Sequence, residues 1–116
     1  MAKPVYKILS ASAFAEAKRT ERFTGSADDL RDGFIHLSAA HQLAGTLAKH
    51  FAGQPELVLL AVNAERLGVD LKWEPSRDGE LFPHLYAPLD LAAVLWSKRL
   101  TLGEDGTHIL PEGVLA

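Results

Sequence analysis

The sequence predicts an α+β fold in a single compact domain, with two main helices and about six strands. Three features of the chain support this prediction. The run Leu57–Val62 is apolar throughout, as expected of a central strand covered on both faces. Apolar residues recur every four positions between residues 43 and 51, which is typical of a helix packed on a sheet. A five-residue pattern also occurs twice, as Phe-Ile-His-Leu-Ser at residues 34–38 and as Phe-Pro-His-Leu-Tyr at residues 82–86.

The first elements follow from apolar runs and capping residues. Residues 5–9 are short and apolar, which predicts a first strand. Ser10 or Ser12 can cap a helix that continues to about Arg19. Residues 20–33 are polar and rich in Gly and Asp, so we expect a functional loop with room for one helical turn. The second strand is predicted over residues 34–37.

The middle of the chain is predicted to hold the longer helix and two strands. Ser38 stands where an N-cap belongs, which predicts a helix over residues 39–51. Gly53 and Pro55 would end that helix. After the central strand, residues 63–68 favour a turn or a short helical piece, and residues 69–74 favour another strand.

The last part of the chain is marked by turn formers. Residues 75–80 predict a loop with Asp78-Gly79 at its tip. The strand that holds His84 contains one proline and precedes another, so an edge or bulged strand is expected. Asp90 can cap one turn over Leu91–Ala93, and Val94–Leu102 predicts a last long strand. Residues 103–116 are expected to form a tail of turns.

Composition excludes several classes of function. The 116 residues are 47% hydrophobic and carry a net charge of −3 without a cluster of basic residues. Non-specific binding to nucleic acid depends on neutralising phosphates, so it is not expected. The absence of cysteine excludes disulfides, thiolate nucleophiles and Cys-based zinc sites. Lys7 interrupts the N-terminal apolar run, so we expect a cytoplasmic protein without a signal peptide or membrane contact; its oligomeric state is left open.

The two repeated patterns locate a candidate site. Side chains alternate between the faces of a strand, so Phe34, His36 and Ser38 would share one face. Phe82, His84 and Tyr86 would do the same on a second strand. If the two strands converge, they form a small pocket with aromatic walls and a few polar groups, which is the usual form of a ligand site.

Each polar residue of the patterns suggests a role. His36 could bond a ribose hydroxyl or act as general acid or base, and it precedes a helix N-terminus that would favour a phosphate. Ser38 is expected to cap the helix and contact a ligand; without a Gly-x-Ser-x-Gly motif it is not expected to be a nucleophile. His84 could handle protons. Tyr86 could stack on a planar ring or be a half-buried tyrosine with an exposed hydroxyl.

Three charged residues extend the candidate site. Glu74 follows Trp73, and an apolar setting would raise its pKa and suit it to acid–base work. Arg77 could hold a phosphate and Glu80 could flank the pocket. All three could also be solvated surface charges. Alternatively, His36, His84 and Glu74 could together bind zinc, although their spacing in the sequence matches no metal-binding motif that would require it.

Three segments in order resemble one bacterial family. They are Asp-Gly-Phe-Ile-His-Leu-Ser at 32–38, Trp-Glu at 73–74 and Phe-Pro-His-Leu-Tyr-Ala-Pro-Leu at 82–89. They are similar to the motifs of domain of unknown function 952, over residues 5–102. That family is grouped at fold level with ADP-ribosyltransferases and the RNA 2′-phosphotransferase. The resemblance implies an ADP-ribosyltransferase-like fold, with a curved, split sheet that is mixed or antiparallel around a cleft for NAD.

The resemblance also implies residue roles. His36 and Ser38 match a strand on which the histidine contacts the nicotinamide ribose, although Leu37 stands where glycine is usual. Tyr86 or His84 would take the place of the stacking tyrosine.

The leading hypothesis is therefore a domain that binds NAD, as substrate, or a related nucleotide and cleaves or transfers at the ribosyl carbon. Its catalytic residues would be His36, Glu74 and His84, and Ser38, Arg77, Glu80 and Tyr86 would bind the ligand. The alternatives are a non-catalytic ligand sensor or partner-binding module, and a metal-dependent hydrolase.

Overall fold

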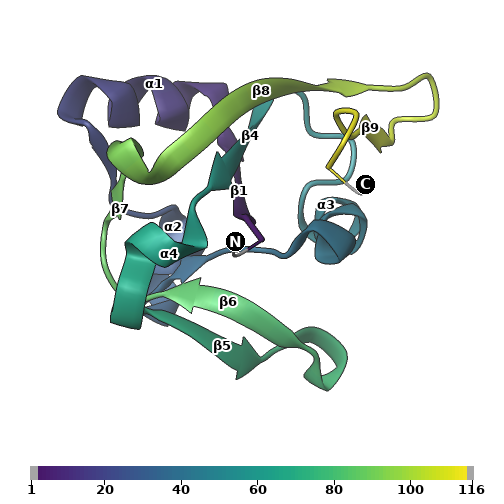
Figure 1. Cartoon of the computed structure of the whole chain (residues 1–116). Coiled ribbons are helices and arrows are strands. Elements are labelled where there is room, and N and C mark those ends of the chain that lie inside the picture. The colour runs from purple at the N-terminus through teal and green to yellow at the C-terminus, as the bar shows by residue number, and fades with distance from the viewer. Residues whose placement is uncertain (1–2, 115–116) are drawn as a thin grey trace.

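The larger sheet of this α+β domain is antiparallel and has the strand order β1-β4-β8-β9. The computed structural model describes residues 3–114, except for the side chain of Arg77. Strand β4 lies between β1 and β8, and all six of its side chains are buried, which confirms the predicted central strand. Figure 1 shows this sheet in the upper half of the molecule. Its strands are β1 (Val5–Ser10), β4 (Leu57–Val62), β8 (Val94–Leu102) and β9 (His108–Ile109).

A second antiparallel sheet, of order β3-β6-β5, continues from the edge of the first. Its strands are β3 (Ile35–His36), β5 (Leu71–Pro75) and β6 (Leu81–Leu85). Two backbone hydrogen bonds between Tyr6 and Ser38, of 2.8 and 2.9 Å, join β1 to the residues after β3. The β5–β6 hairpin lies below the larger sheet in Figure 1. The result is one curled antiparallel surface with its bend beside Ser38.

Helices cover the larger sheet on both faces. α1 (Ala11–Thr20) begins at Ser10, whose hydroxyl accepts a hydrogen bond from the Ala13 amide, as predicted. α3 (Leu43–His50) packs its Leu43 and Leu47 on the opposite face. Two further helices are α2 (Ala27–Asp32) and α4 (Ala64–Leu67); four 3₁₀ turns are Ala40–Gln42, Gly68–Asp70, Arg77–Gly79 and Leu91–Ala93.

The core has one apolar cluster on each face of the larger sheet. Ile35, Leu37 and Leu85 belong to the cluster on the α1 side, so the small sheet contributes to the core as well. Their burial leaves the opposite faces of β3 and β6 for the candidate site, as alternation predicts. The cluster on the α3 side contains Tyr6, Ile8, Leu43, Leu47, Leu57, Leu59, Ala61, Leu100 and Val114.

The start of the longer helix differs from the prediction. Ser38 does not cap it: the Ser38 hydroxyl bonds the Thr46 hydroxyl at 3.2 Å, and its backbone pairs with Tyr6. A 3₁₀ turn precedes α3, and the side chain of Gln42 accepts from the Ala39 amide at 2.9 Å. Ser38 satisfies the usual sequence preference for a cap, but its backbone is held in the sheet.

The segment predicted as a loop over residues 20–33 contains more structure than expected. A short strand, β2 (Arg22–Phe23), pairs with β7 (Leu89–Asp90). Helix α2 then begins with a capping box, in which Ser26 and Asp29 each accept a hydrogen bond from the other's backbone amide. The sequence contains Ser-x-x-Asp rather than the usual Ser-x-x-Glu, and a run of polar residues follows, so no more than one helical turn was predicted in this segment.

Strand β6 is central in its sheet, so the prediction of an edge or bulged strand for His84 was wrong. Pro83 is buried within it and its carbonyl accepts from the Leu37 amide at 3.0 Å. In an antiparallel strand the amide and carbonyl of one residue point to the same neighbour. The missing N–H of Pro83 therefore faces Leu37, just beyond the end of β3, and costs only the reciprocal bond to that residue.

The remaining predictions are mostly confirmed. Asp90 caps the turn Leu91–Ala93, and Val94–Leu102 forms the long strand. Val69 lies in an exposed 3₁₀ turn rather than in β5, and β9 occupies part of the predicted tail. No helix within residues 3–114 has the length and apolar character that a membrane span requires.

Candidate functional site

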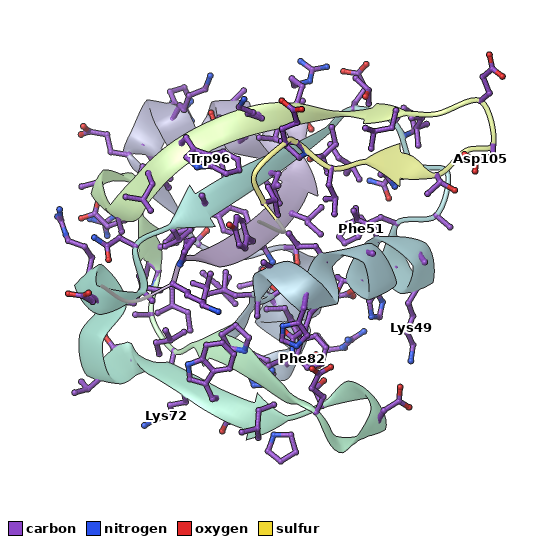
Figure 2. All side chains as sticks on the ribbon, turned by 45° about the vertical axis from the view of Figure 1, so that its right-hand side comes forward. Lys49, Phe51, Lys72, Phe82, Trp96 and Asp105 are labelled. Atoms are coloured by element: carbon purple, nitrogen blue, oxygen red, sulfur yellow. The ribbon has the colours of Figure 1, made fainter. Side chains whose placement is uncertain are left out.

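A cavity of about 270 Å³ lies where the two sheets, α2 and α3 meet. In Figure 2, Phe82 lies between the lower hairpin and α3, and Phe51 lies at the end of that helix. Both residues line the cavity. Its remaining walls come from β1, α2, β3, α3 and β6, through Tyr6, Lys7, Ile8, Ser26, Asp28, Asp29, Arg31, Asp32, His36, Leu37, Ser38, Thr46, His50, Ser76 and His84.

The two repeated patterns meet at this cavity. His36 and His84 are directly opposite each other in the β3–β6 register, and directly opposed side chains share a face. Their ring centroids are 5.9 Å apart, and both residues line the cavity. The geometric basis of the predicted site is therefore present. Phe34 packs against both rings and stacks on His84 at 3.9 Å.

His36 is held by a carboxylate at each ring nitrogen. Its Nδ1 is 2.6 Å from Oδ1 of Asp29, and its Nε2 is 2.9 Å from Oδ2 of Asp32. Helix α2 provides both carboxylates, one turn apart. An imidazole donates from both nitrogens only as the imidazolium ion, so this arrangement is fully satisfied by the protonated ring. Neither ring nitrogen is left for another partner.

Asp29 is the centre of this network. Its carboxylate accepts from the amides of Ser26 and His36, from the His36 ring and from the Lys7 ammonium. Burial acts to raise the pKa of Asp29, but the His36 hydrogen bond and the charge of Lys7, with the two amides, hold that pKa well below its usual range. Asp29 therefore stays ionised inside the protein.

Lys7 lies in β1 and completes the network from the sheet. Its Nζ is 2.9 Å from Oδ2 of Asp29 and 3.0 Å from the His36 carbonyl. Burial lowers the pKa of Lys7, and the charge and hydrogen bond of Asp29 act against that change. Lys7 is thus a structural cation that ties β1, α2 and β3 together beside the cavity.

His84 has a different environment from His36. Its Nδ1 is 2.7 Å from Oε1 of Glu74, and the Tyr86 hydroxyl donates to the same oxygen at 2.6 Å. Within residues 3–114, no hydrogen bond to Nε2 of His84 is present. No buried side-chain nitrogen in that range lacks a partner, so Nε2 is not fully buried. His84 lines the cavity with its Nδ1 engaged by Glu74, which leaves Nε2 for a ligand.

Glu74 does not have the apolar setting predicted for it. Hydrogen bonds from Tyr86 and then His84 lower the pKa of Glu74, whereas an increase was expected. Its side chain is 36% exposed. Glu74 also does not line the cavity, and neither does Tyr86; both lie behind His84. This geometry suits Glu74 to orienting the His84 imidazole, and it does not suit Glu74 to donating a proton.

The other predicted site residues are dispersed. Ser38 lines the cavity, but its hydroxyl bonds Thr46. Glu80 pairs with His41 at 2.6 Å and lies outside the cavity lining. The side chain of Arg77 falls outside the described part of the structure. The helix N-terminus expected to receive a phosphate is also absent from the lining, because α3 reaches the cavity through Thr46 and His50.

Sequence reasoning missed the ionic wall of the cavity. Lys7 inside an apolar strand was one signal, because a charge at a core position needs a partner. Asp29 and Asp32 are spaced three apart on one short helix, but their common partner His36 could not be identified without the fold. Within residues 3–114, no group of three or more histidine, aspartate or glutamate side chains is placed to hold a metal ion.

Comparisons with known proteins agree with the motifs. The family model described as Protein of unknown function (DUF952) matches residues 8–97. The chain belongs to this family. The DUF952 match contains β3, β5 and β6 and so covers both histidines of the cavity. None of the comparisons supports the ADP-ribosyltransferase-like assignment, which stays a prediction.

Solved structures support the DUF952 fold. The X-ray structure of protein CC0527 from Caulobacter crescentus is 53% identical, covers 97% of this chain and 99% of that chain, and gives a TM-score of 0.92. The solution NMR structure of CC0527 is 57% identical over 90% of each chain, with a TM-score of 0.82. No curated protein matches the chain at a significant level.

Proposed function

We propose that this DUF952 domain binds a small polar molecule in the cavity and that His84, oriented by Glu74, exchanges a proton with it. One observation carries the proposal. Nδ1 of His84 is 2.7 Å from Oε1 of Glu74, while the same buried ring lines the cavity. A carboxylate that accepts from Nδ1 leaves the lone pair of the neutral ring on Nε2. That atom can then act as a general base toward a bound ligand.

The surroundings of His84 hold its ring in one orientation. Phe34 stacks on one face at an interplanar angle of 22°. Tyr86 donates to the same Glu74 oxygen that His84 contacts, which fixes the carboxylate. A catalytic group with a fixed rotamer and tautomer loses little freedom on binding its substrate, which favours proton transfer.

His36 is proposed to have a different role from that expected. Both of its ring nitrogens are within hydrogen-bonding distance of carboxylates, so it has no free lone pair for a substrate proton. It is better suited to hold α2 against β3 as one wall of the cavity. We therefore assign proton transfer to His84 and positioning to His36.

The size of the cavity limits the ligand. Its volume of about 270 Å³ is just below the range of about 300–1,000 Å³ that is usual for drug-sized ligands. It can hold a single ring with its substituents. The NAD-related activity implied by the resemblance remains a proposal, in which only one ring of the nucleotide would enter and the rest would lie in solvent.

The experiment compares Glu74→Gln with Glu80→Gln by NMR. Each variant removes one carboxylate from one imidazole, but only the first imidazole lines the cavity. One-ring compounds, nicotinamide among them, and NAD are added to the ¹⁵N-labelled protein. We expect one-ring compounds to shift the resonances of Ser38, Thr46 and Phe82, and Glu74→Gln to change the His84 tautomer and weaken this binding. Glu80→Gln should leave both unchanged.

Two outcomes would contradict the proposal. One is that no compound at millimolar concentration shifts the cavity resonances. The other is that both variants affect binding and the His84 tautomer equally. If ligands bind but the ¹⁵N chemical shifts of the His84 ring do not change on binding, the proton-transfer role fails and the sensor alternative is supported.

A further inference from the structure

One wall of the cavity is a chain of side chains in which basic and acidic groups alternate. It runs from β1 through α2 and β3 back to α2. We infer from it that the cavity takes an uncharged ligand, an inference that rests on the proposed binding function. The chain consists of Lys7, Asp29, His36, Asp32, Arg31 and Asp28, and all six residues line the cavity.

Each neighbouring pair in the chain is in contact. Lys7 and Asp29 are 2.9 Å apart, Asp29 and His36 are 2.6 Å apart, and His36 and Asp32 are 2.9 Å apart. Asp32 is 2.9 Å from Nε of Arg31, whose Nη1 is 3.2 Å from Asp28. Each basic side chain of the chain is therefore paired with at least one carboxylate.

This balance removes the usual means of recognising an anion. Phosphates and carboxylates are bound in proteins by arginine or lysine side chains that have no stronger partner. Here Lys7 and Arg31 are both engaged by aspartates, and Lys7 is buried under its partner. A ligand anion would have to displace Asp28 or Asp32 from Arg31, or enter without a cation.

The other side of the cavity does not change this conclusion. Glu74 lies behind His84 and, as the ionised partner of that imidazole, adds a negative charge near this wall. Opposite it are hydroxyls of Ser38 and Thr46 and the rings of Phe51 and Phe82. These groups suit a ring with hydroxyl, amide or other neutral polar substituents. A charged ligand would lose its hydration without gaining an unpaired counter-charge.

The test uses one-ring compounds in matched sets of three. Each set contains a carboxamide, the corresponding carboxylate and the corresponding aminomethyl cation, for example benzamide, benzoate and benzylammonium. Binding to the full chain is measured at about pH 6, near the unperturbed pKa of histidine, from the shifts of the cavity resonances. We expect the carboxamide to bind at least tenfold more tightly than either the carboxylate or the aminomethyl cation.

A variant with one charge removed tests whether the chain of paired side chains causes this preference. Asp28→Asn removes the exposed end of the chain and leaves Arg31 with one partner fewer. We expect it to strengthen carboxylate binding by about three- to tenfold, because solvent screens the charge of the exposed Arg31 side chain. Asp105→Asn makes the same charge change at the turn between β8 and β9, outside the cavity lining, and should have no effect (Figure 2).

The outcomes separate this inference from the proposed function. If no compound of any set shifts the cavity resonances, the proposed function fails and the inference fails with it. If compounds bind but the carboxylate or the aminomethyl cation of a set binds as tightly as the carboxamide, only the inference is overturned. An equal response of Asp28→Asn and Asp105→Asn would also overturn it, because the alternating chain would then not determine the preference.

Discussion

Lys7 and Asp29 form a buried ion pair, with 2.9 Å between Nζ and Oδ2 and side chains that are only 6% and 2% exposed. The pair is 22 residues apart in the chain and joins β1 to α2. Asp29 is the one buried residue of α2, whose Leu30 is exposed. A short helix is thus attached to the domain through a carboxylate rather than through apolar side chains, and this attachment can be tested.

Replacing Lys7 by methionine should strongly destabilise the fold. Lys7→Met keeps the length of the side chain but leaves Asp29 buried without its ammonium partner. Removal of one member of a buried pair costs about 3–5 kcal/mol in the free energy of unfolding, as measured by urea denaturation. The control Arg99→Met breaks the exposed pair with Glu56 and should cost less than about 1 kcal/mol. Similar costs for the two variants would show that the buried pair contributes little.

Stability should fall in acid because of Asp29. The pKa of Asp29 is lowered in the folded state, so its stabilisation is fully present above the unfolded pKa of about 3.9 and is lost as pH falls toward the folded value. The lowered pKa values of Asp32 and Glu74 act in the same direction. Melting temperatures measured by circular dichroism should therefore decrease steeply below about pH 4.

The matching variant isolates the contribution of Asp29. Asp29→Asn should be much less stable than wild type at neutral pH, and the difference between the two should shrink as the pH is lowered. A difference that stays constant down to pH 2–3, about where carboxylates are protonated, would contradict this account.

The capping box of α2 should contribute measurably. Ser26→Ala removes the acceptor for the Asp29 amide, and such a loss costs about 0.5–2 kcal/mol of unfolding free energy. Ser38→Ala should not show a capping effect, because the Ser38 hydroxyl bonds the Thr46 hydroxyl and caps no helix. Amide hydrogen exchange separates the two: only Ser26→Ala should speed the exchange of the α2 amides.

Tyr86 should control the ionisation of Glu74. Tyr86→Phe removes the hydrogen bond to Oε1, which is the main cause of the lowered pKa of Glu74, so that pKa should rise toward its ordinary value. A ¹³C NMR titration of the glutamate carboxyl groups measures it. Tyr6→Phe is the control, because Tyr6 makes no contact with Glu74. An unchanged Glu74 pKa in Tyr86→Phe would show that the hydroxyl does not bond the carboxylate in solution.

Local sequence patterns were sufficient to predict the main strands and helices and the two histidines of the candidate site. The apolar run at β4, the Ser10 cap and the long strand β8 were predicted because each depends on neighbouring residues or on a short period. The same alternation predicted that His36 and His84 would face a common side. The register between β3 and β6, which places the two histidines directly opposite each other, could be known only from the fold.

Partnerships across the chain could not be predicted in this way. Lys7 and Asp29 come together because β1 and β3 are bridged at Tyr6 and Ser38, which brings α2 under the edge of the sheet. Ser38 illustrates the same point, since its local preference for a cap was overridden by sheet pairing. Sequence alone determined which side chains alternate and which segments are apolar, because those properties are local; the tertiary structure decided which charges pair, because Coulombic contacts depend on distances that only the assembled fold sets.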